Sequence, residues 1–142
     1  MKFRYKYYGK NSMGDRVIRP VIPIKVINND QVVRYEALVD SGADRSIFHS
    51  EVADALGIRM TAGEASGFMG ATGGKARMYI HPIQIEVGGL RFDTKVAFAD
   101  VLGLKGAPGL AGQVGFFNLF VVKFDYQKGV VEIKEKSLQR RI

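Results

Sequence analysis

Two runs of alternating apolar and polar residues, separated by a glycine pair, restrict this chain to an antiparallel sheet more strongly than any other feature. The alternation covers residues 83–87 and resumes over 90–98, with Gly88-Gly89 between the two runs. A period of two is that of a β-strand with one buried face, and two glycines between such runs are typical of a tight hairpin. The pattern predicts paired antiparallel strands that present one face to a core.

The other segments predict further strands and little helix. Strands are expected over 2–8, 17–27, 31–39, 121–126 and 130–133. A further hairpin is expected between residues 65 and 87, with a glycine-rich tip at 67–74. Short helices are predicted over 51–56, with Ser50 as the N-cap, and over 114–120. These elements predict an all-β, barrel-like domain with one or two short helices.

The composition excludes several classes of protein. A chain of 142 residues with 46% hydrophobic residues is expected to form one domain, 1–142, with its core over about 19–133. It has no cysteine, and His49 and His81 do not have a metal-ligand spacing, so we expect neither a metal nor another cofactor. No apolar run approaches the length that crosses a membrane, and the first residues do not resemble a signal peptide. A cytoplasmic protein without membrane contacts is expected.

The net charge of +7 has two interpretations. Basic residues gather at both ends of the chain, and Phe3, Tyr5 and Tyr7 alternate with basic residues near the N-terminus. A nucleic-acid-binding surface would use these rings for stacking. The favoured interpretation is a solvated edge strand and tail, where lysine prevents strands of different molecules from pairing. Nucleic acid is therefore disfavoured as a partner.

The segment 37–48 places a carboxylate at the end of an apolar strand. Ala37-Leu38-Val39 runs directly into Asp40, Ser41 and Gly42. A partly buried carboxylate requires hydrogen bonds, and the glycine lets the backbone turn so that amide N–H groups can supply them. A carboxylate that is held in a fixed position in this way can perform acid–base chemistry.

This segment resembles the active-site loop of the retropepsin-like aspartic proteases, in which two apolar residues precede Asp-Thr/Ser-Gly-Ala. The resemblance extends upstream through Arg19-Pro20-Val21-Ile22 and covers roughly residues 19–133. The glycine-rich tip at 67–74 occupies the place of the family's flap. The apolar-apolar-glycine motif near the C-terminus has its counterpart in Gly109-Leu110-Ala111-Gly112. In the family this last glycine lies behind the catalytic loop, where a side chain would collide.

The resemblance implies a retropepsin-like closed β-barrel, active as a homodimer that cleaves peptide or protein substrates. The chain carries one Asp-Ser-Gly motif, so the two catalytic aspartates would be the Asp40 residues of two protomers, and no cofactor is needed. Ser41 and Gly42 would support this pair. The resemblance implies a set of substrate-binding residues: Ala43, Asp44, Arg45, Ile47, Met69, Gly70, Ala71 and Leu110.

Some residues depart from the family pattern, and alternative functions stay open. Gln113 stands where many relatives carry an arginine that pairs with the acid at the position of Asp44. Asp44 is then expected to pair with Arg45, Arg16 or Arg19, or to stay solvated. A catalytically silent dimerisation or peptide-binding module is the first alternative, and a basic nucleic-acid-binding β-barrel is the second. The glycines before Lys75 lack the serine or threonine of a phosphate-binding loop.

Overall fold

The computed structural model describes residues 1–69, 76–100 and 106–136 of the chain. In chain order the elements are β1 (Lys2–Arg4), β2 (Lys6–Lys10), β3 (Arg16–Arg19), β4 (Val21–Asn28), β5 (Gln31–Val39), β6 (Ile47–His49), α1 (Ser50–Ala55), the 3-10 helix η1 (Met60–Ala62), β7 (Glu64–Met69), β8 (Ala76–Val87), β9 (Leu90–Ala99), β10 (Gly109–Ala111), β11 (Phe120–Asp125) and β12 (Val130–Glu135). No helix within these ranges is long and apolar enough to cross a membrane.

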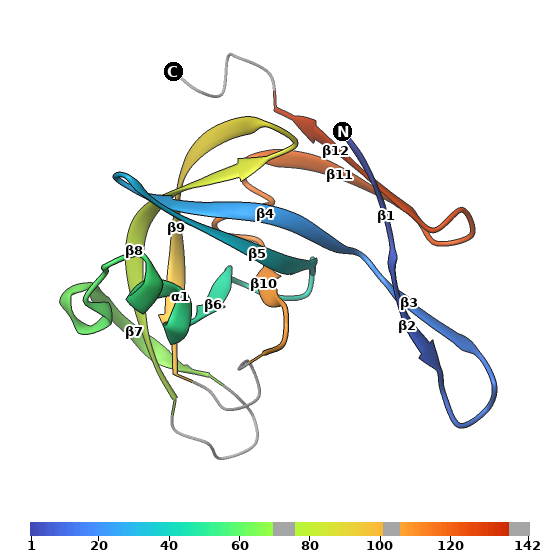
Figure 1. Ribbon diagram of the computed structural model, residues 1–142, viewed down its shortest axis with the longest axis horizontal. Helices are drawn as coiled ribbons and strands as arrows, with labels where there is room; N and C mark the ends of the chain where they lie inside the picture. Colours follow the sequence, from blue (N-terminus) through green and yellow to red (C-terminus); the bar gives the residue numbers. More distant parts are fainter. Residues whose placement is uncertain (70–75, 101–105, 137–142) are drawn as a thin grey trace.

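Six strands form a closed barrel, as the sequence predicts. Their order is β4-β5-β10-β6-β9-β8, and the barrel closes because β4 pairs with β8 as well as with β5. The strand β7 extends the sheet by pairing with the first residues of β8, 76–80. Figure 1 shows the barrel with α1 beside it and β7 at its lower end. Closure pairs the strand edges internally and leaves an interior that side chains fill.

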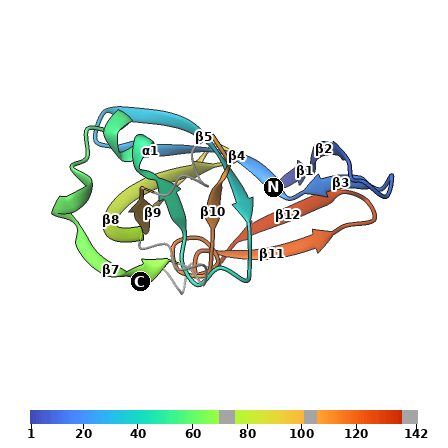
Figure 2. The ribbon, with the colours of Figure 1, turned by 90° about the horizontal axis from the view of Figure 1, so that it is seen from below.

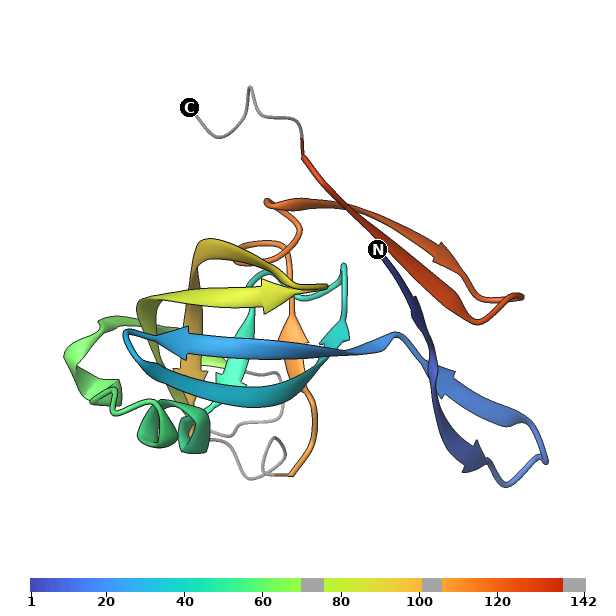
Figure 3. The ribbon, with the colours of Figure 1, turned by 45° about the horizontal axis from the view of Figure 1, so that its top comes forward.

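Two smaller sheets lie beside the barrel. A three-stranded sheet has the order β1-β12-β11, and β2 and β3 form a separate hairpin. In Figures 1 and 3 this hairpin extends away from the barrel, and the β11–β12 hairpin lies above it. Both extend beyond the end of the barrel at which β5 finishes. The chain therefore carries two projections next to the residues that follow β5.

A single large core fills the barrel and reaches the three-stranded sheet. Phe98, Phe120 and Ile22 are among the largest fully buried side chains, and Val131 and Ile133 of β12 belong to the same cluster. The buried positions of β12 alternate, as a one-sided strand requires, whereas residues 96–99 of β9 are buried on both faces. The core therefore fastens β12, and through it β1 and β11, to the barrel.

The predicted strand 31–39 and the predicted turns are confirmed. β5 has the predicted bounds, and β8 and β9 pair from Val87–Leu90 onward, with Gly88 and Gly89 in the left-handed region at φ 58° and 84°. The segment predicted as strand over 17–27, with interruptions at Pro20 and Pro23, is interrupted at Pro20 alone, which separates β3 from β4. Pro23 lies within β4, in a part that pairs with β5 but not yet with β8.

The strand predicted over residues 2–8 is wrong in its continuity. It divides into β1 and β2 at Tyr5, because β1 pairs with β12 whereas β2 pairs with β3. The Tyr5 N–H donates to the carbonyl oxygen of Gly129 at 2.8 Å. Phe3 and Tyr5 pack against the main core. Only Tyr7 of the three rings proposed for nucleic-acid stacking is exposed, so that surface does not form as described.

The N-cap of α1 is His49, and the prediction of Ser50 is wrong by one residue. The Nδ1 atom of His49 accepts a hydrogen bond from the Glu51 N–H at 3.1 Å, and Ser50 is the first helical residue. An imidazole nitrogen can perform the task that a hydroxyl or carboxylate oxygen usually performs at this position. Gly57 ends the helix region with φ 70°, as expected for a residue beyond a helix C-terminus.

The helix predicted over 114–120 is absent, and hydrogen-bonded turns take its place. Gly115 has φ 105°, which a helix cannot contain, and Phe120 already belongs to β11. The N–H groups of Phe117 and Asn118 reach back five residues, to the carbonyl oxygens of Gly112 and Gln113. A side chain at residue 115 would also lie 2.6 Å from a backbone oxygen of β9, so the glycine allows this close approach.

Candidate active site

Asp40 follows the buried strand β5, and the neighbouring strand fixes its backbone. β10 runs parallel to β5 with Ala111 opposite Val39, and the Asp40 N–H donates to the Ala111 carbonyl oxygen at 3.0 Å. Val39 is 3% exposed, whereas Asp40 is half-buried. The apolar residues before Asp40 thus anchor the strand in the core, and the carboxylate emerges at its end, as the sequence predicts.

The Asp40 carboxylate accepts a hydrogen bond from the loop that follows it. Its Oδ1 atom lies 2.9 Å from the Gly42 nitrogen, which donates. A Cβ atom on residue 42 would lie 3.3 Å from the same Oδ1 atom, so only glycine approaches the carboxylate without crowding. The Ala43 N–H turns back to the Asp40 carbonyl oxygen at 3.2 Å. This closed turn gives the carboxylate a fixed orientation.

Gly112 lies directly behind the loop, as the resemblance implies. A Cβ atom there would be 2.6 Å from the Arg45 carbonyl oxygen and 2.7 Å from that of Ala43. Both distances are well inside van der Waals contact, and both involve backbone atoms that cannot rotate away. The glycine therefore sets how closely the loop packs on the end of β10.

Gln113 supports the loop in a way that the sequence did not predict. Its Nε2 atom donates to the Ser41 carbonyl oxygen at 3.0 Å, and its N–H donates to the Ala43 carbonyl oxygen at 2.8 Å. The residue that replaces the family's arginine thus contacts the backbone of the loop instead of Asp44. The sequence separation of 72 residues explains why no local pattern indicated this contact.

Ser46 is a buried supporting residue that the sequence did not indicate. Its side chain is 1% exposed, and its Oγ atom accepts a hydrogen bond from the Gly112 N–H at 3.0 Å. Its own N–H donates to the Val114 carbonyl oxygen at 2.8 Å. A hydroxyl between the loop and an apolar strand could have suggested this role, because a buried polar group requires a partner.

Asp44 and Arg45 lie in the second half of the loop that follows Asp40. Asp44 is exposed, and in the described part of the chain no cation lies within 4.0 Å of it, so none of the three arginines considered from the sequence pairs with it. Arg45 is half-buried and forms an isolated parallel bridge with Val114. Ser41 is exposed, and its supporting role for the catalytic pair stays a prediction.

Ile47 and Leu110 come together, as expected for two residues of one pocket. They are directly opposite in the β6–β10 pairing. They belong to a small apolar cluster, separate from the main core, with Ala97, Ala99, Met78 and Ile80. Met78 and Ile80 belong to the strand that returns from the glycine-rich tip. The alternation of β8 could have identified them, because they occupy every second position of the strand.

The predicted flap is described only in part. Met69 is the last residue of β7 and pairs with Ala76 at the start of β8. The antiparallel pairing of these strands confirms the predicted hairpin. Gly70 and Ala71, two of the predicted substrate-binding residues, lie outside the described residues, and the role of Met69 stays a prediction.

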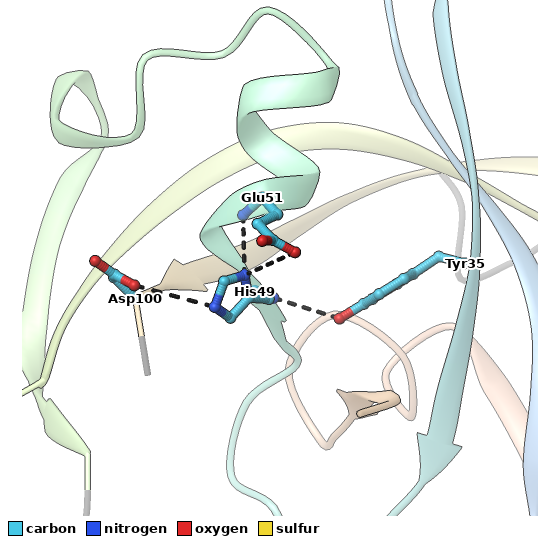
Figure 4. A network of polar contacts seen from close by, with 4 residues as sticks. All are labelled: Tyr35, His49, Glu51 and Asp100. Carbon is cyan, nitrogen blue, oxygen red and sulfur yellow. Dashed lines mark hydrogen bonds and ion pairs between the residues drawn. The ribbon is translucent and has the colours of Figure 1, made fainter. Parts of the chain in front are cut away.

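A second polar centre lies around His49, at the junction of β6 and α1. His49 is 6% exposed, and its backbone N–H donates to the Tyr35 Oη atom at 3.4 Å. Figure 4 shows its ring between Glu51 and Asp100, with Nδ1 3.8 Å from Glu51 Oε2 and Nε2 4.0 Å from Asp100 Oδ1. Burial, with a smaller contribution from the Glu51 charge, raises the pKa of Tyr35 above its usual 10.0.

A groove of about 780 Å³ lies beside this network and apart from the Asp40 loop. Its walls include Tyr35, His49, Val52 and Pro108, and none of residues 40–47 contributes to it. The groove is therefore separate from the half-buried Asp40 carboxylate. Within those residues no group of three or more His, Asp or Glu side chains could hold a metal ion.

Comparisons with known proteins agree with the geometry of the loop. Residues 22–115, more than half of the chain, match the sequence profile of a family described as aspartyl protease. This range includes the Asp40 loop, the flap strands and Gly112. No curated protein matched the chain in a sequence comparison.

Solved structures show the same fold at low sequence identity. The retroviral protease-like domain of Ddi1 from Leishmania major is 19% identical, with a TM-score of 0.60, and the match covers 83% of this chain and 90% of that one. A retropepsin-like aspartic protease from Rickettsia conorii is also 19% identical, with a TM-score of 0.58 and coverage of 92% and 98%. The barrel is therefore retropepsin-like, as expected from the sequence.

Proposed function

The chain belongs to the aspartyl protease family, and we propose that it is an aspartic endopeptidase whose catalytic pair consists of two Asp40 residues, one from each protomer of a homodimer. The observation that carries this proposal is the Asp40 carboxylate itself. It stands at the end of a buried strand, its Oδ1 atom accepts the Gly42 N–H at 2.9 Å, and Gly112 and Gln113 support its loop.

The proposed reaction needs two carboxylates that share one proton around a water molecule. Two adjacent carboxylates repel each other when both are charged, so one is kept protonated. The ionised Asp40 removes a proton from the water, whose oxygen attacks the carbonyl carbon of the peptide bond. The protonated carboxyl of the partner subunit's Asp40 donates a hydrogen bond to the carbonyl oxygen. Proton transfer to the amide nitrogen then allows the C–N bond to break.

The substrate is proposed to be an extended peptide that lies across the loop and beneath the flap. Such a peptide adds a strand to the exposed backbone of the site, and its alternate side chains enter pockets. The cluster around Ile47 and Leu110 would take an apolar side chain. The exposed carboxylate of Asp44 and the side chain of Arg45 would lie beside the main chain of the peptide and a neighbouring pocket.

The sheet beside the barrel supports the proposed homodimer. β12 is paired on both edges, by β1 and by β11, whereas β11 has a partner on one edge only in the described part of the chain. Val121 and Phe124 of β11 are 58% and 41% exposed. An apolar strand with a free edge commonly pairs with another chain. We place the contact with the second copy along β11, close to the loop that holds Asp40.

The test compares the wild-type chain with Asp40→Asn on an unfolded protein substrate from acidic to neutral pH. Asp93→Asn is the matched control, since Asp93 is an exposed carboxylate of β9 that contacts Gln84. Cleavage that pepstatin inhibits, that Asp40→Asn abolishes and that the control retains supports the proposal. Light scattering on each sample measures the molar mass and therefore shows whether the chain is a dimer. A dimer that cleaves nothing at any pH would favour the catalytically silent peptide-binding module. The cytoplasmic location of the protein stays a prediction that this test does not address.

A further inference from the structure

The hairpin of β2 and β3, with its connecting loop, forms an ordered arm. We define the arm as residues 6–19. Asn11 organises its tip, because the Asn11 Oδ1 atom accepts the N–H groups of Met13 and Asp15, each at 3.0 Å. Gly14 completes the turn with φ 83°, and its N–H donates to the Asn11 carbonyl oxygen. The tip is thus held by its own hydrogen bonds.

The arm presents side chains to solvent on both faces. Tyr7 is 51% exposed and Met13 is 83% exposed. The Arg16 guanidinium lies 5.2 Å from the ring centre of Tyr7, and a second arginine stacks in the same way on Tyr8 at 4.9 Å. Two-stranded hairpins are marginally stable on their own, and these cation–π pairs stiffen the arm without burying it. A stiff and uncovered arm of this kind is suited to contact another molecule.

The root of the arm is fixed to the strand that carries the catalytic residue. Lys6 Nζ lies 2.7 Å from Glu36 Oε1, and Glu36 belongs to β5. On the other side, Tyr5 packs edge-on against Tyr126 at 6.3 Å, and its N–H donates to the Gly129 carbonyl oxygen at 2.8 Å. The arm therefore has a set direction relative to both β5 and the β11–β12 hairpin.

That direction leads toward the place of the proposed second protomer. In Figures 1, 2 and 3 the arm and the β11–β12 hairpin extend beyond the same end of the barrel, the end at which β5 finishes. Asp40 follows β5, so a second Asp40 must approach from that end. We propose that the arm of each protomer lies against the barrel of the other and holds the dimer together. This inference rests on the homodimer proposed above.

The distribution of charge selects the surface that the arm contacts. Four basic residues and one acidic residue lie in the arm, whereas residues 20–119, which include the barrel strands, carry nine basic and ten acidic residues. Contact between two arms would be repulsive. Contact between an arm and the partner's barrel avoids this repulsion, and the exposed Asp44 carboxylate, in the loop that follows β5, offers a partner of opposite charge. Reciprocal contacts of arm on barrel satisfy the two-fold symmetry of a homodimer.

The absence of cysteine from the chain makes a direct test possible. Met13→Cys places a single thiol at the exposed tip of the arm, and a benzophenone maleimide on it forms photo-crosslinks with whatever it touches. The experiment uses the Asp40→Asn background, which prevents self-cleavage. Labelled chains are mixed with unlabelled chains grown on heavy nitrogen, and crosslinked peptides are identified by mass spectrometry. We expect crosslinks from light residue 13 to heavy residues of the barrel.

The other outcomes overturn the inference in distinguishable ways. A dimer in light scattering with crosslinks only within one chain, or none, would refute the role of the arm and leave the proposed protease intact. Crosslinks that form only when an acidic peptide or single-stranded DNA is added would assign the arm to that partner instead. A chain that stays monomeric at all concentrations would contradict the arm and the proposed function together.

A charge variant gives an independent measure. Arg16→Ala should weaken dimerisation by about fivefold or more, as expected for a stacked arginine at the centre of a contact. Added salt should reduce the difference from wild type. Arg59→Ala is the matched control and should leave the dimer constant unchanged. Arg59 is an exposed arginine between α1 and η1, and α1 lies well away from the arm in Figure 1. Equal dimer constants for wild type and Arg16→Ala would refute the inference.

Discussion

The substitution Gly112→Ala tests the packing behind the Asp40 loop. The added Cβ atom would lie 2.6 Å from the Arg45 carbonyl oxygen and 2.7 Å from the Ala43 carbonyl oxygen. Ordinary contact between carbon and oxygen is about 3.2 Å or more, so the loop must move by about 0.5 Å. Neither oxygen belongs to a side chain that can rotate away. The methyl group therefore displaces the backbone that carries the hydrogen bonds of Asp40.

The expected loss of stability in Gly112→Ala follows from the cost of overpacking the protein interior. Inserting a methyl group into a closely packed site costs about 1–3 kcal/mol. For a chain of this length each kcal/mol corresponds to a decrease in Tm of about 2–4 °C, so we expect a decrease of about 2–12 °C. Catalysis should suffer more than stability, because a displacement of this size at a reacting group costs about tenfold or more in kcat.

Thermal unfolding and peptide cleavage measure the two effects. Gly67→Ala is the control for stability, since a Cβ atom at Gly67 would meet nothing within 4 Å and the same methyl group is added there. We expect the control to unfold at the wild-type temperature. Wild-type Tm and wild-type kcat in Gly112→Ala would refute the argument that this glycine sets the position of the loop.

Three further substitutions test two supports of the Asp40 loop and the tyrosine beside His49. Ser46→Ala removes the buried oxygen that accepts the Gly112 N–H. Urea unfolding should show that the free energy of unfolding falls by about 1–3 kcal/mol. An unchanged urea midpoint would show that the N–H finds another partner. Gln113→Ala breaks an exposed hydrogen bond to the Ser41 carbonyl oxygen. The kcat should fall, while the free energy of unfolding changes by less than about 1 kcal/mol. A kcat equal to that of the wild type would contradict the role of Gln113 in supporting the loop. Tyr35→Phe tests the raised pKa. The phenol ionises near pH 10 in the unfolded chain and at higher pH in the folded one. The free energy of unfolding of the wild type should therefore fall above pH 10 more steeply than that of the variant. Parallel plots of unfolding free energy against pH would refute this.

Local patterns predicted most of the strands and the turn at Asp40. Apolar alternation and turn residues identified β5 with its observed bounds, the Gly88-Gly89 hairpin, and the glycine behind the loop. These features depend on residues close in sequence, or on a family motif that spans them. The amino-acid sequence alone is therefore enough to predict them.

Contacts between distant segments leave no such local pattern. The hydrogen bond from Gly112 to Ser46 joins residues 66 positions apart, and it depends on β10 lying between β5 and β6. The predicted helix over 114–120 failed because Gly115 packs against β9 with φ 105°, a tertiary constraint that overrides local preference. The pairing of β1 with β12 likewise turned Phe3 toward the core.

Mixing active and inactive subunits tests the central claim most directly, that the catalytic pair spans two protomers. Wild-type and Asp40→Asn chains are combined in varying ratios at fixed total concentration, allowed to exchange subunits, and assayed for peptide cleavage. If each active centre needs Asp40 from both chains, activity follows the square of the wild-type fraction and an equal mixture keeps about a quarter of the wild-type activity. If activity instead falls in proportion to the wild-type fraction, with about half remaining in the equal mixture, each chain works alone and the shared catalytic pair is contradicted.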